Sequence, residues 1–175
     1  MHKIVPVLSP NFFTMIQSLS YPLNSSNIGG CHTFRFIEAD NVLTLVVNTL
    51  YNYVSAIDLK SDTAFHSGYA SFRSLQFRER MRKNDSGYYF LTRISGFYPG
   101  LSPQVLNIFS AMQHHEFIVS VTDNNNQTRL AGTPRTPMKF TFDQASGANP
   151  SQRNGFEFRF EGELLEPSPF FNLIL

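Results

Sequence analysis

The amino-acid sequence predicts a mainly β protein, in which an antiparallel β-sandwich or barrel is flanked by one α-helix. Three observations predict this fold class. Short segments of alternating apolar and polar residues recur along the chain, clusters of Asn, Asp, Gly and Ser separate them, and helical spacing is strong only at about residues 103–114. A chain of 175 residues can bury one core, so a single domain over residues 1–175 is expected.

The strand prediction is strongest near the carboxyl end, where three phenylalanines alternate with three charged residues. The phenylalanines are Phe156, Phe158 and Phe160, and the charged residues are Glu157, Arg159 and Glu161. Because successive side chains of a strand point to opposite faces, the phenylalanine face should be buried. The three charged residues then face water or a neighbouring subunit, and we treat them as candidate interface residues. Similar alternation at 117–121 and 140–142 predicts an antiparallel meander.

Two hairpins are expected in the first half of the chain. Residues 33–38 and 42–47 flank a short polar turn, and residues 71–81 and 88–94 flank a longer turn rich in Asn, Asp, Ser and Gly. Strands are therefore expected to dominate both halves.

Two Ser-Pro pairs carry helix start signals. Ser102 can cap a helix and Pro103 suits its first position, so one helix is predicted over about residues 103–114. Its apolar face consists of Val105, Ile108, Phe109 and Met112. Ser9 and Pro10 repeat the signal and predict a second, short helix near residues 10–18.

The two halves of the chain also correspond in order, a pattern that an internal duplication would produce. The copies would span about residues 9–99 and 102–167, with longer loops in the first copy. Chance similarity between two stretches rich in Asn and Phe is the interpretation that the sequence alone favours, and the duplication is the alternative. The matching segments are 9–16 with 102–109, 32–34 with 115–117, 40–41 with 123–124, and 87–90 with 155–158.

The composition favours a surface that meets other proteins. Charged residues make up 15% of the chain, against about 25% in an average globular protein. A net charge of +1 excludes a strong attraction of the whole molecule to nucleic acid or an anionic membrane. The single cysteine, Cys31, excludes an intrachain disulfide. The apolar runs are too short to span a membrane, so synthesis and assembly in a cytoplasm, with no membrane partner, are expected.

The sequence contains no motif typical of an enzyme. A nucleophile elbow, a phosphate-binding loop, a dinucleotide fingerprint and a His-Glu-x-x-His pair are all missing. We therefore expect no catalytic residues, no metal ligands and no cofactor. The adjacent residues His114, His115 and Glu116 are interpreted as a helix end, because neighbouring side chains there point in different directions. A hydrolase that uses dispersed carboxylates is a weaker alternative.

The sharpest charged cluster is a row of arginines. Arg78, Arg80 and Arg82 alternate along one predicted strand, so they share one face. Such a row is a candidate contact for a polyanion or for carboxylates of a neighbouring subunit. A row that simply faces water is the alternative.

An apolar arm, residues 164–175, ends the sequence. Pro167 and Pro169 favour an extended conformation over a helix. A free arm of this kind would promote aggregation, so it either packs in its own core or docks on a neighbouring chain. The candidate subunit-interface residues of this arm are Phe170, Phe171, Leu173, Ile174 and Leu175.

Several motifs of the second half resemble a known group of proteins. They are EFIVSVTDN at 116–124, RLAGTP at 129–134, FTF at 140–142, RNGFEF at 153–158, and Glu161-Gly162. This succession resembles small virion structural proteins of tailed bacteriophages and prophages, of the tail-tube, tail-completion and neck type. The first half, including Tyr51, Tyr53 and residues 60–67, does not fit the pattern.

The resemblance implies a structural protein of the virion that assembles into a ring or tube. Its partners would be copies of itself and other virion proteins, with non-specific contact to DNA in a central channel, and assembly would occur in the host cytoplasm. The alternative from another class is a β-sandwich that binds a small ligand or a glycan on aromatic side chains. Those side chains would be Tyr51, Tyr53, Tyr88, Tyr89, Phe97 and Tyr98.

Overall fold

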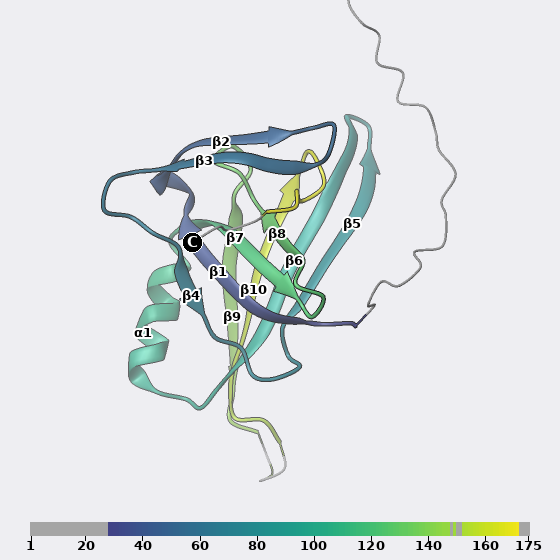
Figure 1. The fold of residues 1–175 in the computed structure, drawn as a ribbon. Coiled ribbons are helices and arrows are strands. Elements are labelled where there is room, and N and C mark those ends of the chain that lie inside the picture. Colours follow the sequence, from purple (N-terminus) through teal and green to yellow (C-terminus); the bar gives the residue numbers. More distant parts are fainter. Residues whose placement is uncertain (1–27, 148, 150–151, 172–175) are drawn as a thin grey trace, which may run out of the picture.

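The computed structural model describes residues 28–147, 149 and 152–171. It confirms a mainly β, antiparallel fold with one α-helix (Figure 1). The short helix expected near residues 10–18 lies outside the described residues. The elements are β1 (Cys31–Glu38), a 3-10 turn (Ala39–Asn41), β2 (Val42–Asn48), β3 (Tyr53–Leu59), β4 (His66–Gly68), β5 (Gln76–Asn84), β6 (Gly87–Pro99), α1 (Pro103–Met112), β7 (Glu116–Asp123), β8 (Thr128–Ala131), β9 (Met138–Ala145) and β10 (Gly155–Leu164).

Most strands belong to one sheet. Its order is β4-β1-β7-β9-β10-β6-β5, and β8 pairs with β7 beside this path. Strands β2 and β3 form a separate two-stranded ribbon. In Figure 1 this ribbon crosses the strands of the main sheet at the top of the view, and α1 lies at the lower left.

The first predicted hairpin, residues 33–38 with 42–47, is wrong in its pairing. The 3-10 turn carries the chain away from the sheet, and β2 pairs with β3 while β1 pairs with β4 and β7. The reason lies in β1, which contributes an apolar side chain to the core on each face of the sheet. Phe34 belongs to one core and Ile37 to the other, so β1 is a central strand, and Val42 of β2 packs over its second face.

The second hairpin and the helix are confirmed. Strands β5 and β6 pair from Gln76 to Asn84, and Asp85 and Ser86 form the two-residue turn. Helix α1 begins where expected, because the Ser102 hydroxyl accepts a hydrogen bond from Val105 N–H at 3.2 Å.

Two hydrophobic cores lie on opposite faces of the main sheet. The larger core contains most of the aromatic rings, and we call the face of the sheet that it covers the inner face. All three phenylalanines of β10 are buried there, as the alternation in that strand predicts. The smaller core lies between the sheet and the β2–β3 ribbon, around Ile37, Ile118 and Leu130. Because β7 contributes to both cores, it is the most deeply buried strand of the fold.

The strands outside the β2–β3 ribbon fall into two sets of four that follow the same order. The first set is β1, β4, β5 and β6, and the second is β7, β8, β9 and β10. Within each set the first strand pairs with the second and the third with the fourth. The sets join through β1 against β7 and β6 against β10. The β2–β3 ribbon is then an insertion in the first set.

Both joins have the register that a twofold axis would produce. Such an axis places equivalent residues opposite each other where it crosses a strand pair. When the match of residues 32–34 with 115–117 is extended along the strand, Phe36 is equivalent to Val119. These two residues face each other in the sheet. Arg93 faces Glu161, the partner that the match of 87–90 with 155–158 assigns to it. The internal duplication itself stays a prediction, because the helix expected in its first copy lies outside the described residues.

Candidate functional site

One edge of the main sheet is long and open. Strand β5 ends the sheet and pairs only with β6, whereas the opposite edge, β4, has three residues. In an antiparallel pair, alternate residues direct their backbone N–H and C=O groups away from the partner strand. At the beginning of β5 the Phe77 backbone forms a hydrogen bond with the Cys31 side chain. The outward groups of Glu79, Met81 and Lys83 have no backbone hydrogen-bond partner within the described part of the chain. An edge of this kind is a template for pairing with another chain.

The three predicted arginines form one exposed row on this edge strand. Arg78, Arg80 and Arg82 face Arg93, Leu91 and Tyr89 of β6. None of the three arginines makes an ion pair or a side-chain hydrogen bond with another described residue. Their charges are therefore available to a partner.

The arginine row continues across the outer face, the side of β5, β6, β9 and β10 that points away from the larger core. A shallow pocket of about 250 Å³ in this face is lined by Arg78, Arg93, Arg153 and Arg159, together with Glu157. Arg93 pairs with Glu161, and the Arg153 guanidinium lies 5.4 Å from the centre of the Phe97 ring. Arg78 and Arg159 keep no such partner among the described residues, so the pocket has an excess of positive charge.

The charged ladder of β10 lies on the same outer face, as the sequence predicts. Glu157 is exposed, while Arg159 and Glu161 are partly buried beside Thr141 of β9 and Arg93 of β6. Because Glu161 already pairs with Arg93 within the chain, Glu157 and Arg159 are the members that a neighbouring subunit can reach.

The first part of the carboxyl-terminal arm binds its own chain. Phe171 is 4% exposed and packs in the smaller core. Phe170 N–H donates to Asn52 O, Phe171 N–H donates to Thr128 O, and the Arg129 guanidinium lies 4.3 Å from the centre of the Phe170 ring. These contacts tie the arm to β3 and β8. Leu173, Ile174 and Leu175 lie outside the described residues.

A carboxylate anchors this arm to the main sheet. Glu79 of β5 points to the inner face, and its Oε2 accepts hydrogen bonds from Ser168 N–H at 3.0 Å, Ser168 Oγ at 2.6 Å and Thr92 Oγ1 at 2.9 Å. Ser168 and Thr92 are both fully buried. Sequence reasoning missed this group, because a glutamate between two arginines of an exposed strand gives no signal of an inward role.

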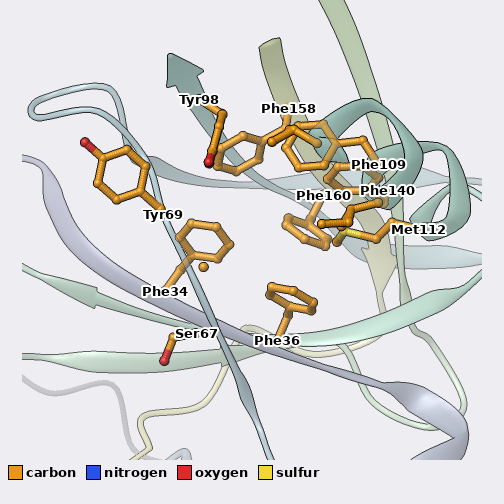
Figure 2. Close-up of a pocket in the computed structure, with 13 residues that line it drawn as sticks. Phe34, Phe36, Ser67, Tyr69, Tyr98, Phe109, Met112, Phe140, Phe158 and Phe160 are labelled. Carbon is orange, nitrogen blue, oxygen red and sulfur yellow. The ribbon is translucent and has the colours of Figure 1, made fainter. Parts of the chain in front are cut away.

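An apolar cavity of about 200 Å³ opens between α1 and the inner face. Figure 2 shows rings from β1, β10 and α1 around it, among them Phe34, Phe160 and Phe109, with the Tyr69 hydroxyl pointing outward at the rim. The Phe158 ring lies across Gly96, where an added Cβ would come within 2.6 Å of it. A glycine inside a strand signals such a close approach, and the predicted apolar face of α1 supplies other lining residues.

The six aromatic residues proposed for stacking do not form one surface. Tyr98 lines the cavity, Phe97 is buried, and Tyr88 is exposed near the β5–β6 turn. Tyr51 lies in the turn before β3, and Tyr53 is the first residue of β3. Of these residues, only Tyr98 contributes to the cavity.

The remaining polar groups do not assemble a chemical site in the described part of the chain. His115 Nδ1 lies 3.4 Å from Glu38 Oε1, and no group of three or more potential metal ligands occurs among the described residues. Burial raises the pKa of the Cys31 thiol, and the Asp123 charge adds to the effect, which makes the thiol a poor nucleophile.

None of the family models, curated proteins or solved structures compared with this chain matches it. Within the described residues, no helix has the length and apolar character needed to cross a membrane.

Proposed function

We propose that this chain is a structural protein that assembles with copies of itself by joining sheets edge to edge, as a tail or neck component of a phage or prophage virion. The observation that carries the proposal is the edge strand β5, with the unpartnered backbone groups of Glu79, Met81 and Lys83 and its exposed arginine row. The resemblance of the second half to virion proteins supports the place in a virion.

Charge favours a head-to-tail contact over a symmetric one. Two β5 strands paired with each other would bring like-charged arginine rows together, which is destabilising. The opposite edge, β4, carries no lysine or arginine, so a contact between β5 and β4 avoids this repulsion. Pairing of β5 with the β4 edge of the next copy repeats the same contact, and such heterologous contacts close into rings or extend as tubes.

A proline on the open edge tests this assembly. The hairpin closes with the pair Asn84 and Gly87, so Met81 N–H points away from β6. Met81→Pro removes this donor and is compatible with an edge strand. We expect wild-type protein to form rings or tubes by negative-stain microscopy, and Met81→Pro to remain monomeric by light scattering.

Met81→Ala is the matched control, because it shortens the same side chain and keeps the N–H. It should assemble like the wild type. A wild-type protein that stays monomeric at high concentration, or a Met81→Pro variant that assembles normally, would disprove the edge-to-edge mechanism.

The cavity beneath α1 favours a second candidate function, the binding of a small apolar ligand. Cavities of this size lined by aliphatic and aromatic side chains bind molecules such as benzene. We expect saturating indole to raise the melting temperature of the wild type, because a ligand that binds only the folded state stabilises it.

Val105→Phe, which places a ring in the cavity wall, should abolish this increase. Asn107→Phe, on an exposed position of the same helix, should leave the increase unchanged. If indole leaves the melting temperature of the wild type unchanged, the cavity has no such role.

A further inference from the structure

The twofold relation between the two strand sets predicts what should lie against each part of the inner face. Helix α1 covers the inner face of the β9–β10 pair. Its Phe109 ring lies 5.2 Å from Phe140, 5.4 Å from Phe142, 5.3 Å from Phe156 and 6.2 Å from Phe158, measured between ring centres. These four rings of β9 and β10 are the docking surface for the helix.

Three of the four equivalent positions of the first set are apolar. The fourth, equivalent to Phe140, is Glu79, which binds the arm through Ser168, and the Lys83 ammonium lies 5.6 Å from the centre of the Tyr88 ring. The match of 87–90 with 155–158 makes Tyr88 equivalent to Phe156 and Phe90 equivalent to Phe158. Phe158 pairs with Phe142 on β9, and Phe90 pairs with Met81 on β5. Met81 is 63% exposed and Tyr88 is 60% exposed. Exposed large apolar side chains that lie together on a sheet face indicate a docking site.

We propose that residues 9–19 of the same chain, which lie outside the described residues, dock as a helix on this surface. The positions that correspond to the α1 face carry large apolar residues as well. Phe12, Met15, Ile16 and Leu19 correspond to Val105, Ile108, Phe109 and Met112. Their spacing of three and four residues forms one helical face.

The length of the connecting chain permits this docking within one molecule. The described part begins at Ile28, three residues before Cys31, whose N–H donates to Leu75 O next to the beginning of β5. Met81 lies six residues beyond Leu75, about 20 Å along this strand. Nine residue steps separate Leu19 from Ile28 and can span about 30 Å. Docking within one chain avoids the loss of translational and rotational entropy that binding to a second copy requires, so it has the smaller entropic cost. The inference does not depend on the proposed assembly.

Site-directed crosslinking tests the docking in the full chain. In a Cys31→Ser background, Ile16→Cys is combined with Met81→Cys, and the protein is treated with a short bis-maleimide. We expect an intrachain crosslink that runs as a monomer on a denaturing gel and is identified by mass spectrometry. Thr14→Cys with Met81→Cys is the matched control. Thr14 lies on the polar face of the predicted helix, so this pair should crosslink several-fold more slowly.

Two outcomes would overturn the inference. Equal crosslinking of both pairs, or none with Ile16→Cys, would exclude the docked helix. A crosslink found only in dimers would assign the surface to a second copy. An independent measurement uses the unsubstituted residues: deletion of residues 1–27 should raise the rate of Met81 oxidation by peroxide several-fold. Buried Met138 should remain protected in both proteins, which also shows that the truncated chain is folded.

Discussion

The substitution Phe160→Ala is expected to lower the free energy of unfolding by about 3–5 kcal/mol. Phe160 is 0% exposed, and its ring lies against rings from three other strands. The neighbouring rings are those of Phe34, Phe36, Phe117, Phe140 and Phe158, with centre-to-centre distances between 4.9 Å and 6.3 Å. Removing the ring therefore leaves a void at the centre of the larger core that the rigid sheet around it cannot close. Urea unfolding followed by fluorescence or circular dichroism measures the loss.

Phe72→Ala is the control for this substitution. Phe72 is 87% exposed and contacts the Arg73 guanidinium at the surface, so its removal should change stability by less than about 0.5 kcal/mol. Equal losses for Phe160→Ala and Phe72→Ala would contradict the placement of β10 in the core.

The core around Phe160 could be predicted because its signal is local. Alternation in β10 separates Phe158 from Glu157 and Arg159 whatever the neighbouring strands are, since the side-chain period of a strand is two. The Ser102 cap and the β5–β6 turn are local in the same sense. In each case a few adjacent residues determine the structure.

The pairing of β1 and β2 could not be predicted from local pattern. Two apolar runs separated by a short turn are typical of a hairpin, yet β1 contributes to the cores on both faces and is central in the sheet. Both of its edges are occupied by β4 and β7, and β7 lies about 80 residues farther along the chain. Partner choice at this separation depends on tertiary packing, which a single sequence does not display.

In the candidate site, too, the features that depend on neighbouring residues could be predicted, and those that depend on distant residues could not. The shared face of Arg78 and Arg80 follows from strand periodicity, and the structure confirms it. The position of β5 at the sheet edge depends on the whole strand order and could not be foreseen. The link from Glu79 to Ser168 joins residues 89 apart, and neither residue type signals burial by itself.

The substitution Glu79→Ala is expected to lower the free energy of unfolding by about 2–5 kcal/mol. It leaves three donors on the fully buried Ser168 and Thr92 without their acceptor, and each buried unsatisfied group costs about 1–3 kcal/mol, less whatever relaxation recovers. Glu79→Gln keeps one acceptor oxygen and should lose less. Glu163→Ala removes an exposed carboxylate from the outer face of β10 and should be nearly neutral.

A second measurement separates loss of the arm from a general loss of stability. If Glu79 anchors the arm, Glu79→Ala should increase amide hydrogen exchange at Phe170 and Phe171, whose N–H groups donate to Asn52 O and Thr128 O, more than exchange in β7. The arm would then detach before the sheet unfolds, because Ser168 is its direct bond to β5. Exchange that rises equally in the arm and in β7 would assign Glu79 to the overall stability of the fold. A Glu79→Ala variant as stable as Glu163→Ala would show that Glu79 does not anchor the arm.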